Sequence, residues 1–68
     1  MRNLRRRLAK KVISERGGKS QRQYAAELGL SYATYNRMEA ASQNVSLDIL
    51  ELLCERLDCD VGDLFPTE

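Results

Sequence analysis

Four side chains near the middle of the chain have types that suit contact with the edges of nucleic-acid bases. The guanidinium of Arg37 can donate two parallel hydrogen bonds to guanine, and Ala33 can pack on a thymine methyl group. Asn36 can read adenine or hold a phosphate, and Tyr32 can offer its ring to a methyl group or its hydroxyl to a base or phosphate. On a helix, Ala33, Asn36, Arg37 and Ala40 share one face, flanked by Tyr32. We therefore expect base reading to fall on Tyr32, Ala33, Asn36 and Arg37.

Ordinary structural roles are the alternatives for these side chains. Arg37 could form a surface salt bridge with Glu39 or another acid, and Tyr32 could be a partly buried ring. Tyr24 and Tyr35 fall on inward helical faces, so we expect them in the core.

The segment that carries these residues, 20–39, is predicted to form two short helices joined by a tight turn. Ser20 is a plausible N-cap, and Gln23 completes a capping box with it. Gly29 can take the positive φ of a sharp turn, and Ser31 caps the second helix. This is the layout of a helix-turn-helix motif, in which the second helix enters the major groove of DNA.

Apolar periodicity predicts helices on both sides of this motif. Leu4, Leu8 and Val12 form a stripe that ends at Gly17, and Ser46 caps a leucine-rich helix. The sequence therefore predicts an all-α domain over residues 1–68, with five helices at about 3–16, 21–28, 32–39, 47–57 and 61–65. The core positions expected on the flanking helices are Leu4, Leu8, Val12, Leu47, Leu50, Leu53, Cys54, Leu57, Val61, Leu64 and Phe65.

The formal net charge of +1 hides a separation of charge along the chain. Residues 1–37 hold ten Lys and Arg against two Glu, a net of +8, and residues 38–68 hold one Arg against eight acids, a net of −7. A positive half that also carries the reading helix favours a polyanionic partner. The ordinary alternative is a helix with solvated charges.

The sequence lacks the residues that other classes of function require. The 68 residues contain no histidine, no CxxC pair and no glycine-rich phosphate loop, so we expect no enzyme activity, no metal and no cofactor. Cys54 and Cys59 are expected to be free thiols. No apolar run reaches the ~20 residues of a membrane span, and the charged N-terminus does not resemble a signal peptide, so we expect no membrane association and a cytoplasmic protein.

Phosphate contacts are expected around the reading helix. Gln21 and Ser31 lie at helix N-termini, which favour anions, and Arg22 and Lys19 add charge. Capping is the alternative role of Ser31. The N-terminal arginines could form an arm or a helix end that reaches phosphates or the minor groove, with solvated helix charge as the alternative; they are Arg2, Arg5, Arg6 and Arg7.

The ordered set of residues resembles the Cro/repressor type of helix-turn-helix, the XRE family, over about residues 4–65. The matching residues are Ser20, Gln21, Tyr24, Ala25, Glu27 to Ser31, Thr34, Met38 and Glu39, followed by SLDILELLCERLDCDVGDLF. The resemblance implies a five-helix lambda-repressor-like domain. It also implies that Gln21 clamps a phosphate and supports the reading helix. The loop residues Ser42, Gln43 and Asn44 look like the family's backbone-contacting loop, although a solvated loop is the alternative.

Two departures from the family concern the end of the first helix. Compared with relatives, the segment Gly18-Lys19 contains one extra residue before the Ser20-Gln21 pair. In relatives, an arginine of the first helix often pairs with the glutamate that ends the third helix. In this chain the position that matches this arginine is Ile13. We therefore expect Glu39 to pair with Lys10, Arg16 or backbone groups.

The resemblance implies a homodimer that spans two half-sites about 34 Å apart. Ile49 and Leu52 lie off the core stripe of their helix and could form the interface, although a lone exposed leucine is common. The sequence thus predicts sequence-specific binding of double-stranded DNA by a homodimeric transcriptional regulator, more specifically a repressor, with no small-molecule ligand. The alternatives are a protein-interaction module on the same fold, such as an antitoxin or co-regulator component, and nonspecific nucleic-acid binding.

Overall fold

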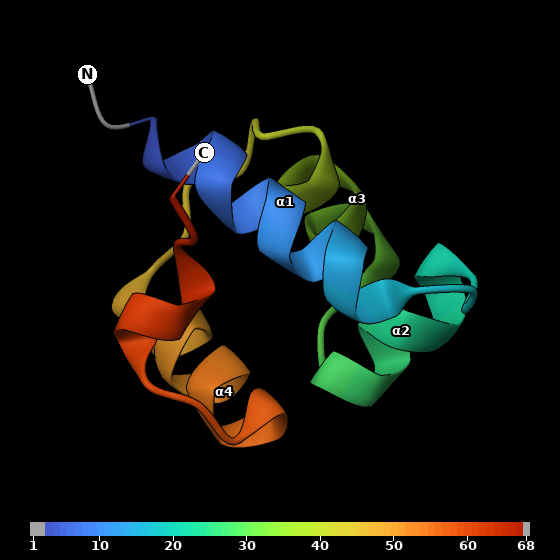
Figure 1. Cartoon of the computed structure of the whole chain (residues 1–68). Coiled ribbons are helices and arrows are strands. Elements are labelled where there is room, and N and C mark those ends of the chain that lie inside the picture. Colours follow the sequence, from blue (N-terminus) through green and yellow to red (C-terminus); the bar gives the residue numbers. More distant parts are fainter. Residues whose placement is uncertain (1–2, 68) are drawn as a thin grey trace.

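Four α-helices and one turn of 3₁₀-helix follow one another in the computed structural model, which describes residues 3–67 (Figure 1). Their bounds are α1 Leu4–Arg16, α2 Gln21–Leu28, α3 Tyr32–Glu39, α4 Leu47–Leu57 and η1 Val61–Leu64. The all-α class is confirmed. The prediction of five helices holds only in part, because the fifth is a 3₁₀ turn of four residues rather than an α-helix.

Three serines begin three of the helices in the same way. The side-chain oxygens of Ser20, Ser31 and Ser46 each accept a hydrogen bond from the backbone N–H three residues later, at 3.0, 3.1 and 3.1 Å. These bonds satisfy amide groups that have no partner inside the helix. The capping box expected at α2 is only half formed, because the side-chain amide of Gln23 donates to Glu27 instead.

Gly29 produces the turn between α2 and α3. Its φ of 77° lies in the left-handed region, and its N–H donates to the carbonyl of Ala26 at 3.1 Å. A side chain there would be strained, and its Cβ would lie 3.1 Å from the Arg56 guanidinium. The glycine therefore fixes the angle at which the motif presents α3.

The core lies where α1, α2 and α3 meet α4 and η1, with α3 packed against both α1 and α2. Tyr24 and Tyr35 pack edge to face with ring centroids 5.7 Å apart. The buried cluster consists of Leu8, Val12, Tyr24, Ala25, Leu28, Tyr35, Met38, Leu53 and Leu64.

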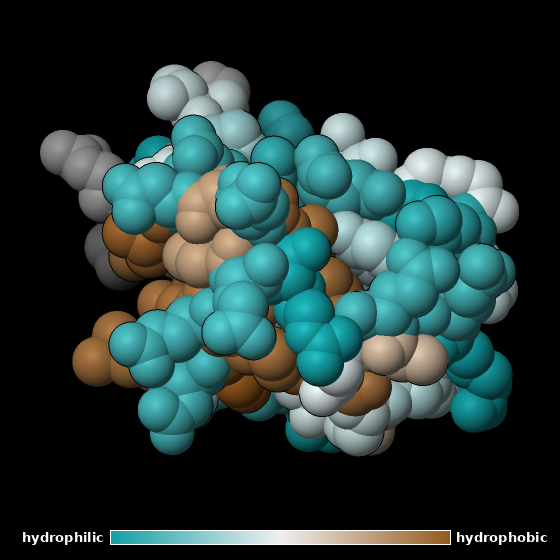
Figure 2. All heavy atoms as spheres, turned by 90° about the horizontal axis from the view of Figure 1, so that it is seen from below, coloured by the Kyte–Doolittle hydropathy of each residue, from teal (hydrophilic) through white to brown (hydrophobic). Residues whose placement is uncertain are grey.

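Three apolar side chains that were expected in the core are exposed instead. Leu4 is 51% exposed, Leu47 is 78% exposed and Val61 is 47% exposed. Each is the first residue of its helix. Figure 2 shows apolar residues gathered toward one end of the face on the side of α4 and η1, while the opposite end is mainly hydrophilic.

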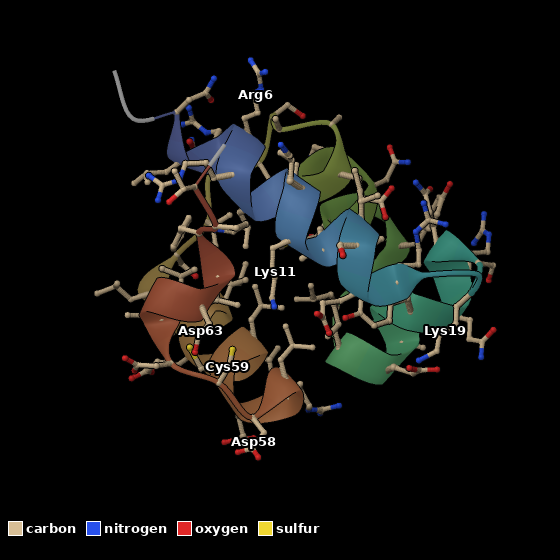
Figure 3. All side chains as sticks on the ribbon, in the orientation of Figure 1. Arg6, Lys11, Lys19, Asp58, Cys59 and Asp63 are labelled. Atoms are coloured by element: carbon tan, nitrogen blue, oxygen red, sulfur yellow. The ribbon has the colours of Figure 1, made fainter. Side chains whose placement is uncertain are left out.

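The charge separation of the sequence persists only in part in space, because Arg7 of the basic half bonds to the carbonyls of Phe65 and Pro66. Figure 3 places Lys19 beside α2, and it places Asp58 and Asp63 at the α4–η1 end of the molecule. Within residues 3–67, no helix combines the length and the apolarity that a membrane crossing requires.

Candidate nucleic-acid interface

The outer face of α3 is a solvent-exposed ridge formed by Ala33, Asn36 and Arg37. On the opposite face of the same helix, Tyr35 and Met38 are buried at 0% and 2% exposure. The ridge is therefore not packed into the molecule's own interior, and its side chains are accessible to a ligand.

A hydrogen-bonded chain connects this ridge to the start of α2. The side-chain nitrogen of Asn36 donates to Oε1 of Gln21 at 3.1 Å, and the nitrogen of Gln21 donates to Oε1 of Glu39 at 2.6 Å. One N–H of Asn36 is thus used, and its oxygen and second N–H are available. Gln21 likewise has a second N–H that does not take part in this bond.

Glu39 is the anchor of that chain, and its partner is Arg16. Nε of Arg16 donates to Oε2 of Glu39 at 2.7 Å, and Nη2 donates to Oε1 at 3.3 Å. Burial raises the pKa of Glu39, but the polar hydroxyl of Tyr35, hydrogen bonds from Arg16 and Gln21 and the positive charge of Arg16 outweigh burial, so its pKa lies below the ordinary value. Of the three partners expected for Glu39, the structure selects Arg16, which lies three residues after the family's usual position.

Arg37 is held by the loop that follows α3 rather than by an acid. Its Nε donates to Oε1 of Gln43 at 2.8 Å. The N–H and hydroxyl of Ser42 both donate to the carbonyl of Arg37, at 3.0 and 3.3 Å. The loop is therefore attached to α3, and this contact uses the Nε of Arg37 rather than its Nη groups.

Two further cations near the motif have partners on the protein surface. The guanidinium carbon of Arg22 lies 4.2 Å from the ring centre of Tyr32, which is 38% exposed. Nζ of Lys19 lies 2.8 Å from Oε1 of Glu27 and 5.4 Å from the ring centre of Tyr24. Arg22 and Tyr32 thus form a stacked pair beside α3, whereas the charge of Lys19 is partly neutralised by Glu27.

The N-terminal arginines do not form an extended arm in the part of the chain that the structure describes. Arg5 donates to the carbonyl of Gln43 at 3.2 Å and to the side-chain oxygen of Asn44. Arg7 donates to the carbonyls of Phe65 and Pro66 at 2.7 and 3.0 Å, so it ties α1 to the C-terminal segment. Arg6 is exposed on α1. Arg2 lies outside the described residues.

The two residues expected at a dimer interface, both on α4, have different surroundings. Ile49 is partly buried and packs against the core, so little of it is available to a partner. Leu52 is partly exposed. Both cysteines of the α4–η1 region are free thiols, and burial beside Cys54 raises the pKa of Cys59.

Two contacts of the interface lay beyond sequence reasoning. The resemblance implied that Gln21 supports the reading helix, but it did not identify Asn36 as the side chain that bonds to it. Nor did any spacing rule bring Gln43 to Arg37, because the loop between them is irregular.

A comparison against family models assigns most of this fold to a known family. The model described as Helix-turn-helix matches residues 11–64, which is well over half of the chain. This chain belongs to the XRE-type helix-turn-helix family. The family fold is that of DNA-binding transcription regulators and is generally non-enzymatic. Searches among curated proteins and among solved structures gave no match.

Proposed function

We propose that this helix-turn-helix protein binds double-stranded DNA at specific sequences, as a homodimer, and represses transcription. The observation that carries the proposal is the exposed ridge of Asn36 and Arg37, each held in one orientation by a neighbouring amide. Preorganised donors and acceptors on a helix that fits the major groove distinguish bases at little entropic cost. The dimer supplies the second half-site that a domain of this size needs.

Each side chain has a defined part in this proposal. Arg37 presents its Nη groups to the O6 and N7 atoms of guanine, and Ala33 packs on a thymine methyl group. Gln21, at the N-terminus of α2, directs its second N–H toward a phosphate, and the Arg22–Tyr32 pair flanks it. The loop residues Ser42, Gln43 and Asn44 follow the backbone on the other side, with Ser31 near the start of α3.

The alternative of a protein-interaction module is less well supported by the same face. A surface for a protein partner would carry acidic or bulky apolar side chains on the outer side of α3. Ala33, Asn36 and Arg37 are small, polar and basic. Nonspecific nucleic-acid binding through the positive half remains the competing outcome of the test.

Selection of bound duplexes from a random pool, at near-physiological salt, tests the proposal. We expect a motif, and Arg37→Ala should relax preference at one base position at a cost of about 1–3 kcal/mol. The matched control is Arg22→Ala, which should weaken all duplexes alike and reduce the slope of log affinity against log salt by about one. A pool without any motif would show that specific recognition is wrong.

A further inference from the structure

The two cysteines of the chain lie on either side of the tight turn that ends α4. Cys54 is in the last turn of the helix, and Cys59 follows Asp58, whose φ of 51° lies in the left-handed region. The N–H of Cys59 donates to the carbonyl of Cys54 at 3.0 Å, and the N–H of Asp58 donates to the carbonyl of Glu55 at 3.4 Å. These two bonds form a Schellman motif, in which the side chains at the positions of Cys54 and Cys59 often contact each other.

The backbone bond across the turn limits how far apart the two cysteines can lie. With the nitrogen and the oxygen 3.0 Å apart, standard bond lengths keep the two Cα atoms within about 7 Å of each other. Protein disulfides join Cα atoms that are about 4.4–6.8 Å apart, and pairs beyond about 7 Å cannot be bridged without backbone movement. The turn therefore meets the main distance condition for a bond between the two sulfur atoms.

The side chains of the two cysteines also influence each other. Burial raises the pKa of Cys59, and the neighbouring Cys54 thiol and the Asp63 carboxylate raise it further, whereas Lys11 lowers it. Figure 3 shows Cys59 near Asp63 at the α4–η1 end of the molecule, with Lys11 projecting from α1 on that side. Both cysteines are partly buried and pack against the core. The two thiols are thus neighbours, and both are free in this structure.

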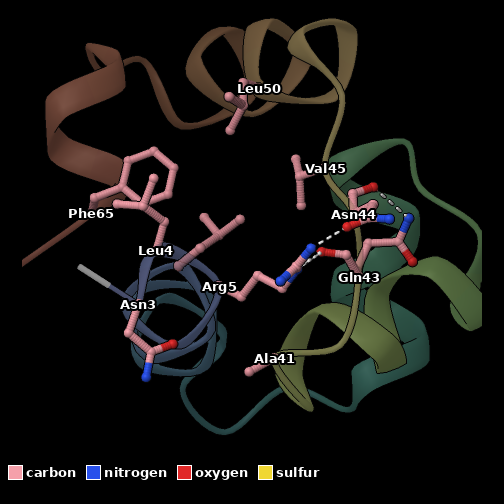
Figure 4. A pocket seen from close by; sticks show the side chains of 10 residues that line it. Asn3, Leu4, Arg5, Ala41, Gln43, Asn44, Val45, Leu50 and Phe65 are labelled. Atoms are coloured by element: carbon pink, nitrogen blue, oxygen red, sulfur yellow. Dashed lines mark hydrogen bonds between the residues drawn. The ribbon is translucent and has the colours of Figure 1, made fainter. Parts of the chain in front are cut away.

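Cys54 can be reached from solvent through a surface hollow between α4 and η1. This hollow has a volume of about 370 Å³, and Leu47 and Val61, which are 78% and 47% exposed, also line it. It shares Leu50 with the larger hollow of about 830 Å³ that Figure 4 shows. A small thiol-reactive molecule therefore has a route to Cys54, whereas the raised pKa of Cys59 makes that thiol slower to react directly.

We propose that Cys54 and Cys59 form a redox-active dithiol, which a small-molecule disulfide such as oxidised glutathione converts into an intramolecular disulfide. The Cys54 thiolate attacks one sulfur of the glutathione disulfide, whose S–S bond breaks and releases one glutathione, which takes up a proton. Cys59 then loses its proton and attacks the Cys54 sulfur of the mixed disulfide, which releases the second glutathione. The two cysteines lose two protons and two electrons, and the glutathione disulfide gains them as two thiols.

The disulfide would close the turn that contains Arg56. The guanidinium of Arg56 donates to the carbonyl of Glu27 at 2.8 Å, so this turn attaches α4 to the end of α2. Because the bond would cross a turn that the fold already contains, it should restrict the unfolded chain more than it strains the folded one. Oxidation is therefore expected to stabilise the native fold, and this consequence does not depend on DNA binding.

Equilibration of the full chain with glutathione buffers of increasing oxidised fraction tests the proposal. Free thiols are blocked with N-ethylmaleimide, and the intact mass is then measured. We expect the wild type to become a monomeric species that lacks two hydrogens and takes up no maleimide. Cys54→Ser and Cys59→Ser should form glutathione adducts at most. A wild type that stops at glutathione adducts, or that forms disulfides only between two chains, would overturn the proposal.

The same equilibration in urea separates the effect of the folded turn from mere closeness along the chain. We expect the equilibrium constant for closing the disulfide to be more than about tenfold larger in the native protein than in the unfolded chain. The oxidised wild type should accordingly melt at a higher temperature than the reduced protein. Equal closing constants in the two states, or a lower melting temperature after oxidation, would contradict the proposal, because the turn would then not favour the bond.

Discussion

The guanidinium of Arg16 holds the carboxylate of Glu39 through two hydrogen bonds, of 2.7 and 3.3 Å, and so joins the last residue of α1 to the last residue of α3. The side chain of Glu39 is only 8% exposed. This contact fixes the end of the reading helix on the scaffold, and the same carboxylate orients Gln21, which in turn orients Asn36. The position of the ridge therefore depends on a residue that lies outside the ridge.

Arg16→Ala should lower the melting temperature by more than about 5 °C, because it leaves a poorly solvated carboxylate without its main partner. The control is Lys11→Ala, which removes an exposed i,i+4 pair with Glu15 and should change the melting temperature little. Differential scanning calorimetry measures both. Equal effects of the two variants would mean that the Arg16–Glu39 contact has no special role.

The stability of the fold should decrease with acid, and Glu39 should be one cause. Its pKa is below the ordinary value in the folded state, so its contribution is present above the pKa of the unfolded chain and is lost as the pH falls through the lower, folded value. Chemical unfolding between about pH 6 and about pH 3 measures this loss. Glu39→Gln should be less stable than the wild type at neutral pH and should lose less stability across the acidic range. An unchanged pH dependence in this variant would contradict the assignment.

The two buried tyrosines should respond in opposite directions to loss of their hydroxyls. The hydroxyl of Tyr24 is buried without a hydrogen-bond partner, whereas that of Tyr35 donates to the carbonyl of Val12 at 3.3 Å. Tyr24→Phe should leave the free energy of unfolding unchanged or raise it by up to about 1 kcal/mol, and Tyr35→Phe should lower it by about 1–2 kcal/mol. Urea denaturation distinguishes them, and a larger loss in Tyr24→Phe would refute the prediction.

Gly29→Ala should destabilise the fold by about 1–2 kcal/mol, because alanine is strained at a φ of 77° and its Cβ would press on Arg56. Arg56 would then give up the hydrogen bond that it donates to the carbonyl of Glu27 at 2.8 Å. Gly18→Ala is the control, since a Cβ there meets nothing within 4 Å. We expect this variant to be as stable as the wild type, and a comparable loss in both would show that the turn geometry is not the cause.

Asn36 should read adenine in the proposed complex. Its bond to Gln21 leaves one acceptor and one donor, which match the N6 amino group and the N7 atom of adenine. Selected duplexes should thus carry adenine at one position, and Asn36→Ala should relax that position alone. Gln21→Ala should relax the same position in part and also weaken binding to all duplexes. A motif with no such position would assign Asn36 to the backbone.

Much of the fold followed from local features of the sequence. Ser20, Ser31 and Ser46 preceded helices as expected, and Gly29 marked the turn, because caps and positive φ depend only on residues within one helical turn. The same local reasoning failed for Leu4, Leu47 and Val61. Periodicity assigns a residue to a face of its helix, but it does not say whether another element covers that face at the helix end.

The sequence by itself determined the helices, the helix-turn-helix layout and the choice of residues on the outer face of α3. Only the tertiary structure decided that Arg16, among the expected partners, reaches Glu39 and that Gln21 orients Asn36. The physical reason is how far apart along the chain the interacting residues lie. Helix caps, turns and amphipathic faces are set by neighbours along the chain, whereas these contacts join residues 15 to 23 or more positions apart, and their geometry exists only after the helices pack.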